Sequence, residues 1–368
     1  MEKLIQTKNT SNIKNKFFIV KILEYGFLKN IHYLVTSILI FGILPIIIIF
    51  YLAFITNRLY IVFRIENWPT FFAISWLSLG PAIIKYVDES ILPNFFLNLK
   101  KILRVSDSDF NEFYFQFENL FHNKYVYFSS LLSLGTLLMG IASTDYVKYY
   151  WNAQSVMEPL SLFILLLLTL TLFLSGIGFC GIYYSIFFII KKLKEVRFTL
   201  DPFSSDGSGG IKFFGEFYIK TTVLFSTGSF VIPAGIQYMM FTRKTISYIG
   251  VILLLIFACF VALSFLIPIL AIKQIAVFEK EKMQFMIIKE YKELLPAYNK
   301  NTQDELDIIR NIASGIKLLV FQQNINRMKA IKVWTIDMEI ITQLFSSIAF
   351  PLFIGYLQQY INKLTISI

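Results

Sequence analysis

Long apolar runs separated by short polar segments dominate the pattern of this chain. A helix that crosses a bilayer needs about 20 mainly apolar residues. The fourth run is longer than a bilayer requires, so one of its ends should reach into water or tilt strongly. The sequence therefore predicts an all-α, polytopic membrane protein. Its seven expected spans lie approximately at residues 33–55, 69–87, 126–143, 159–190, 219–241, 247–272 and 338–361.

Composition supports a lipid environment. Of the 368 residues, 56% are hydrophobic and 16% are charged, and the mean hydropathy is +0.63; a water-soluble chain carries roughly 25% charged residues. Cys180 and Cys259 both lie inside apolar runs, so no disulfide framework is expected. His32 and His122 are isolated, which gives no sign of a metal site, and no cofactor is expected.

The distribution of basic residues predicts the orientation. With seven spans, 26 Lys and Arg residues fall on the side of the N-terminus and 6 fall on the other side. The positive-inside rule then places the N-terminus in the cytoplasm and the C-terminus outside. The net charge of +10 is interpreted as this topology signal, so the expected partner is the lipid bilayer and not nucleic acid. The expected location is the cell membrane, and a composition rich in Ile, Lys and Phe suggests a prokaryotic one.

Four parts are expected along the chain. A cytoplasmic segment (1–32) precedes a six-span membrane domain (33–272), which contains a cytoplasmic loop at 191–218. A cytoplasmic helical hairpin (273–337) then leads to the seventh span and a short outer tail (338–368). The hairpin is predicted from apolar residues at helical spacing on both sides of "PAYNKN". Its apolar faces should pack together or against neighbouring subunits.

The stretch "DPFSSDGSGG" is the clearest candidate site. It is either a tight turn, in which Asp206 bonds to nearby backbone amides, or a small ligand site. Asp-Pro and Asp-Gly pairs favour turns, and glycines provide positive-φ positions. Paired carboxylates can instead offer oxygen ligands to a cation, and glycine amides can cradle an anion. The residues of this ligand or turn loop are Asp201, Asp206, Gly207, Gly209 and Gly210.

Uncharged polar residues form faces on two predicted spans. One face lies on the fifth span and contains Thr222, Ser226, Ser229 and Gln237; the other lies on the seventh and contains Gln343, Ser346 and Ser347. Such faces either line a pore or cavity or make hydrogen bonds between helices. No Asp or Glu falls within the centre of a predicted span, which counts against a rhodopsin, an aspartyl intramembrane protease and most proton-driven transporters.

Two motifs carry a resemblance. "LDPFSSDGSGGIKFFG" resembles a (H/S)-P-D-G-x-G-G-L-x-x-x-G segment of uncharacterised multi-pass membrane proteins of bacteria and archaea. "VWTIDMEIITQLFSSIAFPLF" resembles a W-P-[FI]-D segment near the C-terminus of the same proteins. This chain has Ser204-Ser205 where that family has His-Pro, and Thr335 where it has proline. The resemblance implies no established activity.

The architecture is also loosely similar to that of the insect odorant and gustatory receptor channels. The shared features are seven spans, an inside N-terminus, a long fourth helix and a cytoplasmic hairpin before the last span. That resemblance implies a tetrameric cation channel whose seventh helices line the pore and whose cytoplasmic helices anchor the subunits. The gustatory signature of the last helix is absent here.

Two classes of function follow from these patterns. The first is an oligomeric ligand- or stimulus-gated ion channel. The alternative is a permease for a neutral or lipid-like substrate, or a membrane scaffold or enzyme of unknown activity acting through Asp201 and Asp206. No nucleophile–base pair, phosphate-cradling loop or metal triad is recognisable, so the sequence favours a non-enzymatic role.

Overall fold

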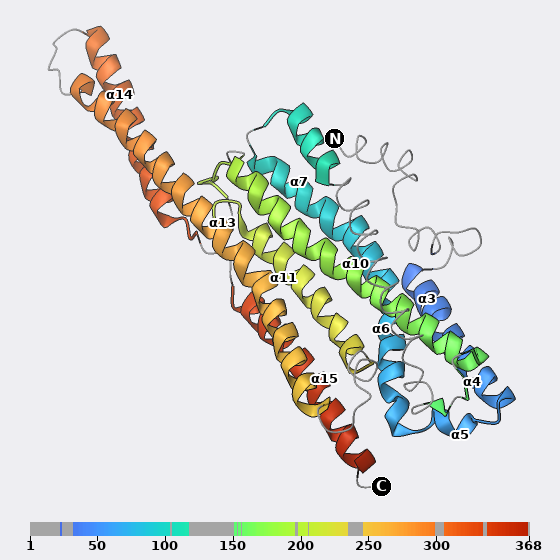
Figure 1. The fold of residues 1–368 in the computed structure, drawn as a ribbon. Coiled ribbons are helices and arrows are strands. Elements are labelled where there is room, and N and C mark those ends of the chain that lie inside the picture. Colours follow the sequence, from blue (N-terminus) through green and yellow to red (C-terminus); the bar gives the residue numbers. More distant parts are fainter. Residues whose placement is uncertain are drawn as a thin grey trace.

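The computed structural model shows a long bundle of helices with a projecting arm (Figure 1). It describes residues 23, 32–103, 105–117, 151–152, 154–155, 157–195, 198–204, 206–234, 246–298, 305–333 and 337–366. Among these residues, helices are accompanied by a single β-bridge between Leu103 and Phe198. The named helices, with η for 3-10 and π-helical turns, are α3 (Tyr33–Ile38), η2 (Leu39–Ile43), α4 (Leu44–Ile55), α5 (Leu59–Val62), η3 (Ile65–Asn67), α6 (Trp68–Tyr86), η4 (Val87–Ile91), α7 (Leu92–Ile102), α10 (Pro159–Glu195), α11 (Lys212–Ser226), η5 (Thr227–Val231), α13 (Ile246–Tyr298), α14 (Glu305–Ala330) and α15 (Met338–Ile366).

Five helices in the described part of the chain are long and apolar enough to cross a membrane. They are Tyr33–Ile55, Trp68–Ile102, Pro159–Gly176, Leu254–Glu293 and Met338–Leu357. The expected span at 126–143 lies outside the described residues. The expected span at 219–241 is described only as far as residue 234; over that part α11 ends at Ser226 and the 3-10 helix η5 follows, and this segment is not among the five. An all-helical fold with five helices suited to cross a membrane is therefore confirmed for the described residues, whereas seven spans and the inside N-terminus stay predictions.

The predicted end of the second span, at residue 87, was too early. Instead of a loop from residue 88, the helix continues without interruption through the π-helical turn η4 into α7, for 35 residues in all. Lys85 and Glu89 therefore lie midway along a helix, with their charged groups 3.7 Å apart. The helix persists because Phe95, Phe96 and Leu99 follow at helical spacing and are buried against the rest of the bundle.

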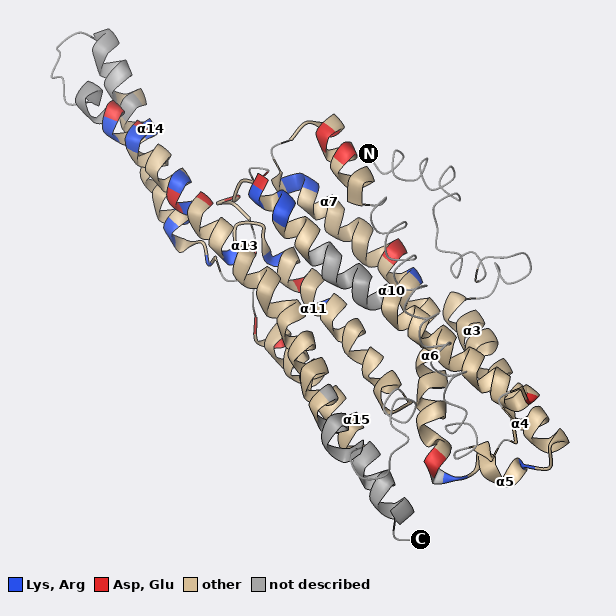
Figure 2. Ribbon diagram, in the orientation of Figure 1, with Lys and Arg blue, Asp and Glu red and all other residues tan. Residues whose placement is uncertain are grey.

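The two longest helices confirm predictions about length. α10 has 37 residues and α13 has 53, which correspond to roughly 55 and 80 Å at 1.5 Å per residue. The sixth predicted span indeed runs straight into the first arm of the hairpin. α14 returns along the outer part of α13, and the two form the arm that projects from the bundle in Figure 1. Figure 2 shows that charged residues gather on this arm and on the neighbouring ends of α7 and α10.

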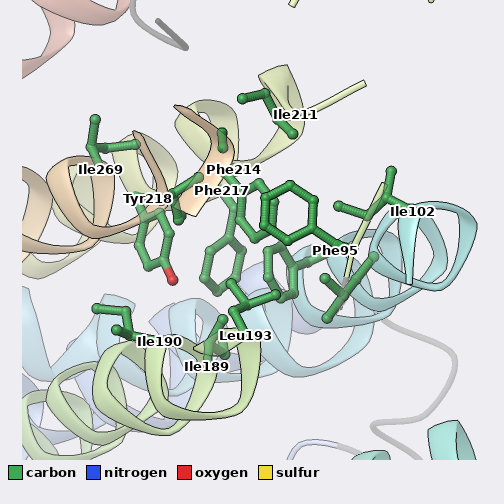
Figure 3. Packing of buried hydrophobic residues seen from close by; sticks show 14 of the residues in the cluster. Phe95, Ile102, Ile189, Ile190, Leu193, Ile211, Phe214, Phe217, Tyr218 and Ile269 are labelled. Carbon is green, nitrogen blue, oxygen red and sulfur yellow. The ribbon is translucent and has the colours of Figure 1, made fainter. Parts of the chain in front are cut away.

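Buried side chains form two clusters. The aromatic cluster joins α7, residues 107–117, the C-terminal part of α10, α11 and α13 (Figure 3). Its centre is Phe95, whose ring stacks on Phe217 at 4.1 Å between centroids and meets the edge of Phe214 at 5.6 Å. The aliphatic cluster joins α4, α5, α6, the beginning of α10 and η5, and contains the tryptophans Trp76 and Trp151.

Candidate functional site

The loop between α10 and α11 folds around the carboxylate of Asp206. The hydroxyls of Ser204 and Ser208 donate hydrogen bonds of 2.8 and 2.7 Å to its two oxygens. The backbone amides of Ser208, Gly210 and Lys212 donate three more, of 2.9, 3.1 and 3.4 Å. All five donors belong to the loop or to the first residue of α11. The carboxylate therefore acts as an internal template for the turn, as the turn interpretation predicts.

Three glycines allow this path. Gly207, Gly209 and Gly210 have φ values of 64°, 74° and 83°, in the left-handed region that side-chain-bearing residues avoid. A Cβ atom at Gly209 would also lie 3.2 Å from a methyl of Leu200 and 3.3 Å from one of Ile331. The prediction that these glycines supply positive-φ positions is confirmed, and Gly209 is additionally needed for a close approach of the chain.

The hydrogen bonds also set the ionisation of Asp206. Partial burial by itself raises the pKa of a carboxyl group, but here the donors from Ser208, Ser204 and Gly210 together outweigh it and lower the pKa to about 2. Asp206 is therefore ionised at neutral pH. Its negative charge is compensated by the hydrogen-bond donors of the loop.

This loop holds together chain segments that are far apart in sequence. On one side, the amide of Thr199 donates to the carbonyl of Ile102 at 2.9 Å, which ties the loop to the end of α7. On the other side, the amide of Lys332 donates to the carbonyl of Gly207 at 3.0 Å, which ties it to the connection between α14 and α15. We call the loop at 198–212 together with residues 331–337 the joint.

Basic side chains reinforce the joint. The ammonium group of Lys280 on α13 donates to the carbonyls of Lys329 and Ile331 at 3.1 and 2.7 Å, and so satisfies the free C-terminal end of α14. Lys212 pairs with Asp337 at 2.8 Å, just before α15. This hydrogen bond and the charge of Asp337 raise the pKa of Lys212. The joint thus fixes the hairpin and the start of α15 to the bundle.

The first polar face lies inside the bundle as far as it is described. Thr222, Ser226 and Ser229 are all buried. The hydroxyl of Thr222 lies 3.3 Å from that of Ser264 on α13, a bond between helices, and the hydroxyl of Ser226 donates to the carbonyl of Val223 at 2.7 Å. Gln237 lies outside the described residues.

The second polar face is divided between the inside and the outside of the chain. Ser347 is buried, and its hydroxyl donates to the carbonyl of Gln343 at 2.8 Å. Gln343 is half-buried, with its amide 3.4 Å from the carboxylate of Glu339. Ser346 is exposed, and its hydroxyl donates to the carbonyl of Thr342 at 3.0 Å. Ser346 and Thr342 are therefore available to lipid, water or another chain.

The arrangement offers little chemistry for a metal. Asp201 uses its carboxylate to accept from the amide of Phe203 at 2.9 Å, so the two loop carboxylates make separate turns. Among the residues that the structure describes, no group of three or more His, Cys, Asp or Glu side chains is suited to hold a metal ion. The sequence missed Lys280, Lys332 and Asp337 as parts of this site, because their partners lie far away along the chain.

Comparison of the chain with known protein families, with curated proteins and with solved structures gave no match.

Proposed function

We propose that the protein is an oligomeric, gated ion channel of the cell membrane. In this proposal the α13–α14 hairpins hold copies of the chain together, and the exposed face of α15 lines the conduit between them. The proposal rests on the membrane character of the helices, on the surface of the hairpin and on the position of α15. It agrees with the loose architectural similarity to insect chemoreceptor channels.

The observation that carries the proposal is the row of exposed apolar side chains on the hairpin. Phe285 on α13 is 70% exposed and Leu319 on α14 is 68% exposed. The segment 279–293 around Phe285 contains eight charged residues, so it does not lie in the hydrocarbon core. Large apolar groups left exposed in water mark a protein interface. Members of this hairpin row are Phe278, Phe285, Ile288, Ile312, Ile316 and Leu319.

A second copy of the same hairpin is the partner that fits this row. On α14 the row has the 4,3 spacing of packed helices, and on α13 Phe278 and Phe285 are one heptad apart. The charged residues of segment 279–293 are four acidic and four basic, so two copies of this segment do not repel each other through net charge. Within the membrane, lipid covers the apolar side chains of α13. Beyond Lys273, only protein can cover the exposed apolar row of the hairpin.

In this proposal α15 lies near such an interface. It packs against α11 and α13 on one side, and its opposite face is uncovered. That face repeats every three or four residues and carries the hydroxyl side chains of Thr342 and Ser346 among apolar and aromatic ones. Its members are Met338, Thr342, Phe345, Ser346, Ala349, Leu352 and Tyr356. Hydroxyl rows facing a common axis offer oxygen ligands to a passing cation.

In this proposal, the joint couples the hairpin to the pore helix and so controls gating. α14 ends at Ala330 and α15 begins at Met338, so only the joint residues separate the proposed assembly helix from the proposed pore helix. Because the joint is bound to α7 through Thr199 and to α13 through Lys280, a movement of the bundle relative to the hairpin is transmitted to the base of α15.

Electrical recording with thiol modification tests the conduit. Ser346→Cys and Ser347→Cys are made in a background with Cys180→Ala and Cys259→Ala, and each protein is reconstituted in planar bilayers. A positively charged thiol reagent should reduce the current of Ser346→Cys by more than half and leave Ser347→Cys unchanged, because Ser347 is 2% exposed. Absence of current, or equal insensitivity of the two variants, contradicts the proposal; saturable uptake of a neutral solute would favour a permease instead.

A further inference from the structure

Five polar side-chain atoms at one end of the bundle are buried and lack a hydrogen-bond partner within the described structure. The five side chains are at most 1% exposed. None of them is ionisable in the physiological range, and they include hydroxyl, amide and indole groups. The atoms are Asn67 Oδ1, Thr70 Oγ1, Trp151 Nε1, Ser161 Oγ and Ser229 Oγ.

These atoms come from segments that pack against one another in the same part of the bundle. Asn67 and Thr70 lie at the start of α6, Ser161 lies at the start of α10, and Ser229 lies in η5. α6 contacts both α10 and η5, and the starts of α6 and α10 lie at the same end of the bundle in Figure 1. Trp151 belongs to the aliphatic cluster, in or against which Phe71, Leu160 and Phe230, the neighbours of Thr70, Ser161 and Ser229, also pack.

The helix positions explain why these hydroxyls have no partner. In the middle of a helix a buried hydroxyl bonds to the carbonyl one turn earlier, as Thr171 does to Leu167 at 2.7 Å. Thr70 and Ser161 are each the third residue of their helix, so the residue four positions earlier precedes the helix. The amide of Asn67 donates to the carbonyl of Ile61 at 2.8 Å, which leaves its own oxygen as an acceptor.

Buried polar groups in native proteins are almost always hydrogen-bonded, to protein or to ordered water. A buried water normally makes about three hydrogen bonds to polar groups that are otherwise unsatisfied. Here the indole N–H of Trp151 is a donor, the oxygen of Asn67 is an acceptor, and the three hydroxyls can be both. We propose that ordered water molecules bind between the starts of α6 and α10 and η5, and that these five groups hold them. This hydration site does not depend on the channel proposal.

Tyr218 provides an internal contrast. Its hydroxyl is also buried without a partner, but among the described residues of the aromatic cluster it is the one such atom. Figure 3 shows it surrounded by Phe217, Ile189 and Ile190. A water molecule there would find one polar partner where it needs two to four. The hydration site is therefore specific to the aliphatic cluster, and Tyr218 is expected to be dry.

The sign of a stability change tests the proposal. Thr70→Val, Ser161→Ala and Ser229→Ala each remove one hydroxyl, and Thr171→Val is the matched control whose hydroxyl is bonded within α10. If water is bound, each of the three variants should lower the apparent Tm of the detergent-solubilised protein by about 2 °C or more relative to that control. If the groups are dry and unsatisfied, removing them raises the Tm, and that result overturns the proposal.

Radiolytic hydroxyl-radical labelling of the unaltered protein in lipid nanodiscs gives a readout that does not depend on variants folding. Radicals formed from bound water modify the side chains beside it, even where bulk solvent has no access. Trp151 and Tyr218 are both 0% exposed and both have readily oxidised rings. After normalisation to intrinsic reactivity, Trp151 should be modified at least several-fold faster than Tyr218. Equal protection of the two side chains overturns the hydration site.

Discussion

Polar groups near the two buried clusters differ in how they obtain hydrogen-bond partners. Around the aromatic cluster, the joint pairs its polar atoms with protein partners, such as the carboxylate of Asp206 with five donors and the ammonium of Lys280 with two carbonyls. Around the aliphatic cluster, Thr70, Ser161 and Ser229 have no such partners in the described structure. The comparison indicates that the joint is fixed by direct contacts between protein groups, whereas the three hydroxyls of the proposed hydration site depend on bound water.

Removal of a central ring should have the largest effect. Phe95→Ala deletes a side chain that is 3% exposed and stacked on Phe217, and it should destabilise the protein by about 3–5 kcal/mol. Leu97→Ala on the same helix is the control, because Leu97 is 42% exposed and its loss should change stability by less than about 0.5 kcal/mol. Thermal unfolding in detergent measures both. Similar Tm values for the two variants would show that the aromatic cluster is not a stabilising core.

Loss of the loop carboxylate should come next. Asp206→Ala leaves five donors without their acceptor, and because the loop is partly solvated the expected loss is about 2 kcal/mol. Asp201→Ala, which loses one bond to the amide of Phe203, is the matched control with a smaller effect. Protease digestion of the loop reports the difference. Equal cleavage rates in the two variants would contradict the template role of Asp206.

The pH dependence of stability has a defined sign. The folded pKa of Asp206, about 2, lies below its ordinary value of 3.8. The contribution of this carboxylate is therefore complete above pH 4 and is lost as the pH falls from about 4 toward 2. The Tm difference between the unaltered protein and Asp206→Asn should shrink over this interval. A difference that stays constant down to pH 3 or grows would contradict the assignment.

Glycine substitutions should have smaller, graded effects. Gly207→Ala and Gly209→Ala both force a side chain into positive φ, at a cost of roughly 1–2 kcal/mol. Gly209→Ala should be the more harmful, because its Cβ meets Leu200 and Ile331 whereas the space beside Gly207 is open. Chemical denaturation of the two variants measures the order. The reverse order would show that Gly209 does not approach Leu200 and Ile331 closely in solution.

The smallest effect is expected from Lys280→Met. It removes hydrogen bonds to Lys329 and Ile331 while retaining much of the apolar stem, so the expected loss is about 1 kcal/mol and is confined to the joint. Lys282→Met on the same helix is the control. Amide hydrogen exchange of peptides covering residues 328–333 should be faster only in Lys280→Met. Unchanged exchange in both variants would remove Lys280 from the joint.

The features that could be predicted from the sequence are those that local residue patterns determine. Long helices and their approximate positions follow from apolar length, and the positive φ of Gly207, Gly209 and Gly210 follows from turn chemistry. The continuation of α6 into α7 was missed because Asp88-Glu89-Ser90 and Pro93 have the composition of a loop. Pro93 is tolerated there because it is the second residue of α7, within the π-helical transition.

Non-local contacts explain what the sequence did not reveal. The ammonium of Lys280 reaches Ile331 across 51 positions of the chain, and the amide of Lys332 reaches Gly207 across more than a hundred. No local spacing encodes such pairs. Likewise, the polarity of Thr222 and Ser347 was evident, but only packing decides that both face the inside of the bundle and that Ser346 does not.

The subunit number tests the central claim most directly, and native mass spectrometry of the protein released from lipid nanodiscs measures it. The account predicts a defined multiple of the 42.8 kDa chain, which dissociates to single chains in Phe285→Glu or Leu319→Glu and persists in the control Glu290→Gln. Single chains in the unaltered protein, or an oligomer that both hairpin variants retain, would contradict assembly through the hairpin and with it the proposed conduit.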